Sequence, residues 1–290
     1  MKHRLFLTAL LATASVAQAH ASSFLWAISS DPNNGFVPNQ FSSVVTSPPA
    51  VTTVATLGNG SLAFNGGLTI GPGGILYGIA NDSFGVGSLY AIQANGTISL
   101  IGSAGGLGSG FFGGLTFSGG LFYGAVTDFL GNTTLESITA SGVATPLGKS
   151  LGTAFSGLAY NSANGMFYGI SNDTLNVSTL VRFTLPGAVT SIGALGFGIG
   201  GLTYDAGLDR FWAIGSVNNA SSQLLQITTA ASVSAPVMTL GDGYVELAVQ
   251  PASAVPEPGT GLLVAFCLGG VFLRFRRRLV SSHALAHDRS

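Results

Sequence analysis

The chain has 290 residues and a formal net charge of −1, with one cysteine and four histidines. A single cysteine excludes an intramolecular disulfide framework, so side-chain packing must stabilise the fold. Between Ser22 and Ala254 the only basic residues are Lys149, Arg182 and Arg210, which excludes the basic stripe that a nucleic-acid partner requires.

Residues 1–21 predict a signal peptide. Basic Lys2 and Arg4 precede an apolar run, and the small residues Ala17 and Ala19 follow it. This order is typical of a secretory signal, whereas a buried first helix would not require it. Ala21 ends a second cleavage site two residues further on, so two starts of the mature chain are predicted.

Residues 22–250 repeat a unit of four short apolar runs, with a period of about 45 residues. One unit has its runs at 66–70, 75–79, 89–92 and 97–102. Each run is bounded by Gly, Asn or Pro and alternates apolar positions, which predicts strands joined by turns. The first run recurs at 114–117, 157–160 and 201–204, so four complete units are present.

The two ends of this region supply a fifth unit. Residues 244–249 fit a first strand with Leu247 in register, and residues 24–28, 41–45 and 51–57 fit the other three strands. A strand from one end then completes a sheet from the other. The pattern predicts an all-β fold, a five-bladed β-propeller with four strands per blade.

Other all-β folds are less consistent with the pattern. Six blades remain an alternative if residues 33–43 contain a further strand. A β-helix has shorter coils, and an open sandwich gives no reason for fivefold similarity. Paired glycines such as Gly113-Gly114 begin the first strands, as expected where inner strands crowd a central channel. Trp26 and Trp212 align with second-strand tyrosines, which predicts core between blades rather than exposed lectin aromatics.

An aspartate follows the second-strand aromatic by five residues in four of the units. These aspartates are Asp31, Asp82, Asp128 and Asp173. The loops between second and third strands open on one face, so an acidic rim is expected there. Its carboxylates could bind Ca²⁺ or sugar hydroxyls. Alternatively, each aspartate bonds its own turn and recurs by duplication, which is the interpretation we favour.

Catalysis by histidine is excluded within the repeats. The histidines are His3, His20, His283 and His287, so no nucleophile–histidine pair or His-ligated metal site can form there. Only carboxylates remain, and Asp205 and Asp209 are expected in a solvated turn beside Arg210. We therefore assign no catalytic residue and expect no cofactor other than Ca²⁺ at the acidic rim.

The C-terminal region predicts a linker (residues 251–258), a transmembrane helix (259–278) and a cytoplasmic tail (279–290). The apolar part rises about 22 Å, short of the roughly 30 Å hydrocarbon core. A helix that continues to Arg278 would span the core, because arginine side chains near its end can snorkel. The arginines keep that end cytoplasmic, so the repeats lie outside the inner membrane.

The linker contains Val255-Pro256-Glu257-Pro258, and the span ends in an arginine cluster, Arg274, Arg276, Arg277 and Arg278. This C-terminal segment resembles the PEP-CTERM sorting signal of Gram-negative bacteria. The resemblance implies processing by an exosortase, with Pro256, Glu257 and Pro258 as its recognition element and the arginines as a retention signal. The tail after Arg278 departs from the family pattern, in which chains usually end soon after the arginines.

Together these features predict an exported, non-catalytic protein of the cell surface or extracellular matrix. Its precursor would be membrane-anchored, and its partners would be the secretion machinery, the exosortase and, at least transiently, the inner membrane. One alternative is a lectin-like propeller that binds Ca²⁺ or an exopolysaccharide. A third hypothesis is an enzyme acting on polysaccharide through carboxylates.

Overall fold

The computed structural model describes residues 22–30, 39–58, 62–82, 86–103, 110–152, 154–216 and 221–251. The chain divides into two units, Met1–Pro251 and Ala252–Ser290, and the second lies wholly outside the described residues. The predicted signal peptide, sorting motif and transmembrane helix therefore lie outside them too. Across the described ranges, no helix is long and apolar enough to cross a membrane.

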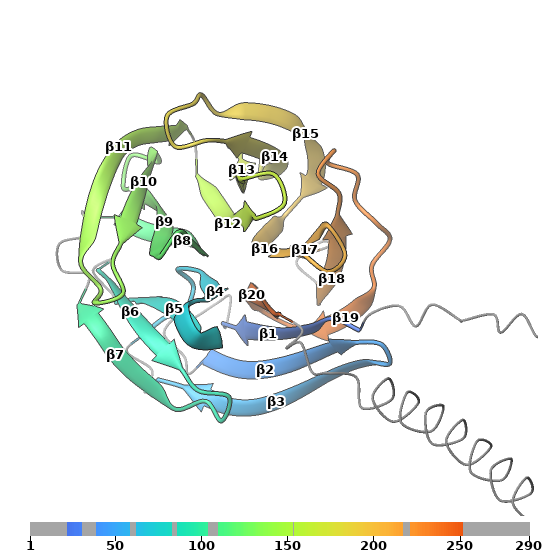
Figure 1. Cartoon of the computed structure of the whole chain (residues 1–290). Coiled ribbons are helices and arrows are strands. Elements are labelled where there is room, and N and C mark those ends of the chain that lie inside the picture. Colours follow the sequence, from blue (N-terminus) through green and yellow to red (C-terminus); the bar gives the residue numbers. More distant parts are fainter. Residues whose placement is uncertain are drawn as a thin grey trace, which may run out of the picture. The chain divides into compact units, whose positions relative to one another are not determined.

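Within the described residues, twenty strands form five antiparallel sheets, or blades, arranged around a central axis (Figure 1). Blade 1 contains β20 (Tyr244–Gln250), β1 (Phe24–Ser29), β2 (Asn39–Thr46) and β3 (Pro49–Leu57). Blade 2 contains β4 (Leu68–Ile70), β5 (Leu76–Asn81), β6 (Gly87–Ile92) and β7 (Ile98–Ser103), with the short 3₁₀ turn η1 (Pro72–Gly74) between β4 and β5.

The other three blades follow in chain order. Blade 3 contains β8 (Gly110–Ser118), β9 (Leu121–Asp128), β10 (Thr133–Ile138) and β11 (Ala144–Gly152). Blade 4 contains β12 (Phe155–Asn161), β13 (Met166–Asn172), β14 (Val177–Phe183) and β15 (Thr190–Phe197). Blade 5 contains β16 (Ile199–Asp205), β17 (Arg210–Ser216), β18 (Ser222–Ile227) and β19 (Met238–Gly241). The prediction of five four-stranded units is confirmed.

Blade 1 closes the ring, as the sequence predicted. β20 pairs with β1, with Gln250 opposite Phe24 and Tyr244 opposite Ser29. Each inner strand also contacts the inner strand of the next blade, in the order β4, β8, β12, β16, β20 and back to β4. β2 belongs to blade 1, so in the part of the chain that the structure describes the sixth-blade alternative is wrong.

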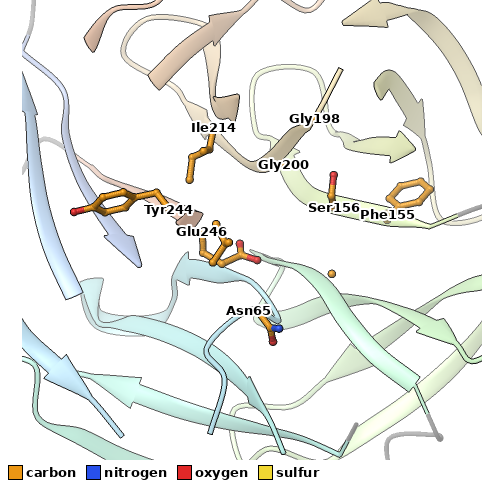
Figure 2. A pocket seen from close by; sticks show the side chains of 10 residues that line it. Asn65, Phe155, Ser156, Gly198, Gly200, Ile214, Tyr244 and Glu246 are labelled. Carbon is orange, nitrogen blue, oxygen red and sulfur yellow. The ribbon is translucent and has the colours of Figure 1, made fainter. Parts of the chain in front are cut away.

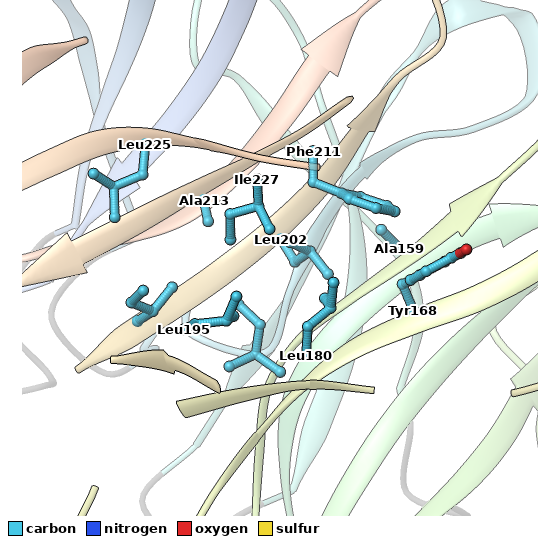
Figure 3. Close-up of a cluster of buried hydrophobic side chains, with 11 residues drawn as sticks. Ala159, Tyr168, Leu180, Leu195, Leu202, Phe211, Ala213, Leu225 and Ile227 are labelled. Atoms are coloured by element: carbon cyan, nitrogen blue, oxygen red, sulfur yellow. The ribbon is translucent and has the colours of Figure 1, made fainter. Parts of the chain in front are cut away.

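The core lies between the blades rather than within one central layer. Five clusters of buried hydrophobic side chains occupy the five junctions between neighbouring blades. Figure 3 shows the junction of blades 4 and 5, where Tyr168 packs against Phe211 with ring centroids 4.7 Å apart. Tyr77–Phe122 and Tyr123–Phe167 are the equivalent pairs at earlier junctions. Since every blade buries both faces, second strands such as β5 are buried at all positions.

Hydrogen bonds link consecutive blades next to these clusters. The Ser178 hydroxyl, in blade 4, bonds both the N–H and the C=O of Ile199, where blade 5 begins. Ser222 makes the same two bonds to Tyr244, where the closing strand begins. Both serines are buried, so these bonds satisfy backbone groups that water cannot reach. The same pair of serine hydrogen bonds is thus found at the junction of blades 4 and 5 and at the junction where blade 1 closes the ring.

Candidate functional site: the central cavity

A cavity of about 390 Å³ lies where the inner strands begin. Side chains and glycines from blades 2 to 5 and from β20 form its walls (Figure 2). The lining residues are Asn65, Gly113, Phe155, Ser156, Gly198, Gly200, Ile214, Tyr244, Val245 and Glu246. Because Tyr244 pairs with Ser29 at the end of β1, the cavity lies toward the face that carries the turns between second and third strands. We call this the hairpin face.

One register position distinguishes the five inner strands. The residue before the aligned leucine is Gly67, Gly114, Gly157 or Gly201 in blades 2 to 5, and Glu246 in blade 1. A methyl group on Gly114 would lie 2.6 Å from the backbone nitrogen of Leu158, and one on Gly157 would lie 2.8 Å from that of Leu202. Glycine is therefore needed where neighbouring inner strands approach most closely. This confirms the expectation of crowding at the channel.

Glu246 is the one residue at this register position that is not glycine, and it places a carboxyl group in the cavity wall. Its side chain is 5% exposed and points toward the open centre between the inner strands (Figure 2). Burial raises the pKa of the Glu246 carboxyl well above its usual range, and a hydrogen bond from the Gly67 N–H opposes this shift. A buried carboxyl without a cationic partner is held neutral. Burial thus favours the protonated form of this carboxyl in the cavity wall.

Two neutral polar residues share the cavity with Glu246. The Asn65 side-chain oxygen accepts a hydrogen bond of 2.7 Å from the Asn81 amide. The Ser156 hydroxyl donates to the Ile199 carbonyl and accepts from the Asn172 amide. These bonds fix the orientation of both side chains, which makes the polar wall preorganised.

The sequence did not single out Glu246. A signal was present, because aligning the first strands on Leu247 places Glu246 in a column of glycines. The glutamate at this position matters because the position faces the central channel, and the sequence alone does not show the channel. A carboxylate in isolation on a short strand carries no such information.

The predicted acidic residues that the structure describes each bond the backbone of their own turn. The Asp128 carboxylate accepts hydrogen bonds from the N–H groups of Leu130 and Asn132, at 2.9 and 2.8 Å. The Asp173 carboxylate accepts two equivalent bonds, and that of Asp82 accepts one from Val86. Bonds from Asn132, first from its side chain, lower the pKa of Asp128. The turn-forming interpretation is confirmed for these three aspartates.

Asp31, the fourth predicted member of the rim, lies outside the described residues. In the described ranges, no group of three or more acidic, histidine or cysteine side chains is arranged to hold a metal ion. Binding of Ca²⁺ at the hairpin face therefore stays a prediction, and a calorimetric titration with CaCl₂ would test it.

Asp205 and Asp209 do not act as a pair of like groups. Asp205 is buried and accepts hydrogen bonds from the Ser23 hydroxyl and the Trp212 indole, at 2.5 and 3.1 Å. Asp209 is exposed and accepts a bond from the Tyr204 hydroxyl. Burial, followed by that hydrogen bond, raises the pKa of Tyr204 to about 12. Asp205 also accepts hydrogen bonds from the N–H groups of Gly207 and Leu208, so the expected turn is correct for both aspartates. The expected solvation is wrong for Asp205, which links blade 5 to the start of blade 1.

The two tryptophans are core residues, as predicted. Trp212 is 1% exposed at the junction of blades 5 and 1. Trp26 stacks on Phe41 with ring centroids 4.8 Å apart, at the junction of blades 1 and 2.

No protein-family model matches the chain, and a search of curated proteins finds no match. Among solved structures, a chain of a nidogen/laminin complex is similar with a TM-score of 0.51 and 12% identity, covering 80% of this chain and all of that one (100%). TolB from Acinetobacter baumannii has a TM-score of 0.49 and 13% identity, covering 76% of this chain and 53% of its own. At such identities the likeness shows the fold alone.

Proposed function

We propose that the chain is an exported, non-catalytic propeller that is sorted to the cell surface or extracellular matrix and binds a ligand there. The signal peptide would direct export, and the segment that resembles a PEP-CTERM signal would hold the precursor in the inner membrane until an exosortase processes it. The sequence of the two ends motivates the route, and the propeller motivates a binding role.

The observation that carries this proposal is the placement of the two ends of the ring. Phe24 and Gln250 are paired at the start of β1 and the end of β20, so both ends of the propeller lie at the face opposite the hairpin face. A chain held through its C-terminal segment would attach at that face. The hairpin face and the cavity near it would then be free to meet a ligand.

The described carboxylates also favour binding over polysaccharide hydrolysis. Asp82, Asp128 and Asp173 form turns, and Asp205 links two blades. Hydrolysis by paired carboxylates requires two acids within roughly 5–10 Å of one scissile bond. Structural roles for these four acids make them poor candidates for a catalytic pair.

Fractionation of the native host tests the route of export. The wild-type chain is expected in the outer or extracellular fraction, and a Pro256→Ala, Pro258→Ala variant is expected to accumulate in the inner membrane. Pro251→Ala, an exposed proline outside the motif, is the matched control and should behave as wild type. Equal distribution of the wild type and the double variant would contradict the proposal.

A further inference from the structure

The central cavity combines the size and the chemistry of a small-ligand site. Its volume of about 390 Å³ lies within the range of roughly 300–1,000 Å³ that is usual for small-molecule pockets. The walls are mostly apolar or glycine, with Asn65, Ser156 and Glu246 as polar groups. A few fixed polar groups on an apolar wall are what orient a ligand in such sites.

The hydrogen-bonding capacity of these groups is defined by their neighbours. Among the described residues, Gly67 is the one that hydrogen-bonds the Glu246 carboxyl, and it does so as a donor. In its protonated form, which burial favours, the Glu246 carboxyl accepts through one oxygen and donates through the other. Asn65 uses its oxygen toward Asn81, which leaves its NH₂ as a donor. The Glu246 carboxyl and the Asn65 amide can therefore each donate a hydrogen bond to an acceptor oxygen of a ligand.

We propose that this cavity binds one uncharged sugar unit at the end of a glycan chain, with the Glu246 carboxyl and the Asn65 amide donating hydrogen bonds to its oxygens. Sugar hydroxyls supply many acceptor oxygens, and they can return donors to the Ser156 hydroxyl. A neutral ligand suits this site because burying a charge without a formed ion pair is unfavourable. This inference deepens the binding role proposed above but does not depend on the route of export.

A cationic ligand is the competing occupant, and it differs in what it requires of Glu246. An ammonium group would bind the ionised carboxylate and displace its proton. A sugar needs the protonated form, which a glutamine amide imitates as a donor and a carboxylate does not. Replacement of Glu246 by Gln therefore separates the two ligand classes.

Calorimetry on the full chain, purified in a detergent without a sugar head group, provides the test. The probes are the methyl glycosides of glucose, galactose, mannose and N-acetylglucosamine, with lysine methyl ester as the cationic comparison. We expect at least one glycoside to bind the wild type and Glu246→Gln within about threefold of each other. We expect Glu246→Gly to bind it about tenfold more weakly, the effect of one lost neutral hydrogen bond.

Glu246→Gly places at this position the residue that the other four blades carry, so the backbone can accommodate it. Asp128→Asn, on the hairpin face, is the matched control and should leave the affinity unchanged. The proposal is overturned if no glycoside binds the wild type, or if Glu246→Gly binds as the wild type does. It is also overturned if Glu246→Gln loses as much affinity as Glu246→Gly, or if lysine methyl ester alone binds.

A pH series keeps the test decisive if Glu246→Gly does not fold. Glycoside affinity of the wild type should fall as pH rises through the pKa of Glu246, whereas that of Glu246→Gln should stay constant.

Among the strands that contact β20, β1 and β4 carry no titratable side chain. β16 and β17 carry Tyr204, Asp205 and Arg210, all near the opposite end of the sheet and roughly 10–13 Å along the strands from Glu246. Tyr244 lines the cavity, but its hydroxyl bonds Ser42. An affinity that does not change with pH in either protein would contradict the proposal.

Discussion

Glu246 shows how much one residue can depend on the closed ring. Four inner strands have glycine at its position because a side chain there would collide with the next strand. β20 tolerates a glutamate because its side chain turns into the cavity and meets the Gly67 N–H. The consequence is a carboxyl that is removed from water in the folded state and hydrated in the unfolded chain.

This difference predicts a pH-dependent stability. The pKa of Glu246 is raised on folding, so the folded state binds more protons than the unfolded state at pH values between the two pKa values. The contribution of Glu246 to the free energy of unfolding is therefore fully present below its pKa in the unfolded chain. It falls as pH rises toward its pKa in the folded state, by up to about 1.4 kcal/mol per pH unit.

Glu246→Gln should remove that loss. Its free energy of unfolding, measured by urea denaturation from pH 4 to pH 9, should exceed that of the wild type by an amount that grows with pH and then levels off. Comparing two proteins that differ at one position cancels the titration of all other groups. A difference that is constant with pH would mean that Glu246 is hydrated in the folded state.

The residues that the sequence identified correctly are those whose role is local. Asp128 bonds N–H groups two and four residues ahead, so its turn could be predicted from the turn preference of aspartate. The local bonds of Asp205 fit the same preference, but its contact with Ser23 could not be predicted this way, because Ser23 lies 182 residues away in the chain. Long-range hydrogen bonds of this kind exist only once the blades are in place.

At the scale of the strands, the repeat predicted the fold well. Short alternating runs with glycine-rich turns gave the four strands of each blade, and the aliphatic-Gly ends marked each unit. The pairing of β1 with β20 followed from the incomplete units at the two ends. The side-chain partners across the junctions did not follow, because aligning Tyr168 with Trp26 does not show which residues of the next blade each one packs against.

The inner-strand glycines give a prediction with an internal control. Gly114→Ala places a methyl group 2.6 Å from the Leu158 nitrogen, against backbone that cannot move independently. It should lower the free energy of unfolding by about 1–3 kcal/mol. In Gly200→Ala the nearest atom is the Ser156 carbonyl oxygen at 3.6 Å, so the change should be within about 0.5 kcal/mol. Thermal unfolding followed by circular dichroism would measure both, and equal effects would contradict the crowding of inner strands.

The whole ring is held together by ordinary junctions, including the one that joins its ends. Leu247 and Tyr244 of β20 pack with Trp212 of blade 5, and Ala248 packs with blade 2. β20 therefore contributes to two junctions as well as to its own sheet. Without it, β1 would expose an unpaired strand edge, which favours aggregation.

A pair of truncated chains tests this closure. A chain that ends at Pro251 should unfold at the same temperature as the full chain, because all twenty described strands remain. A chain that ends at Gly243 lacks β20 and should lose its cooperative thermal transition. A cooperative transition of the shorter chain near the original temperature would mean that β20 does not close the ring.

We propose that the propeller is an exported protein released from a C-terminal membrane signal. The most direct measurement is the intact mass of the native chain recovered from the outer or extracellular fraction of its host. We predict a mass that lacks the signal peptide, starting at His20 or Ser22, and that ends near Pro256. A mass that extends to Ser290, in the inner membrane, would contradict the claim and make residues 259–278 a permanent anchor.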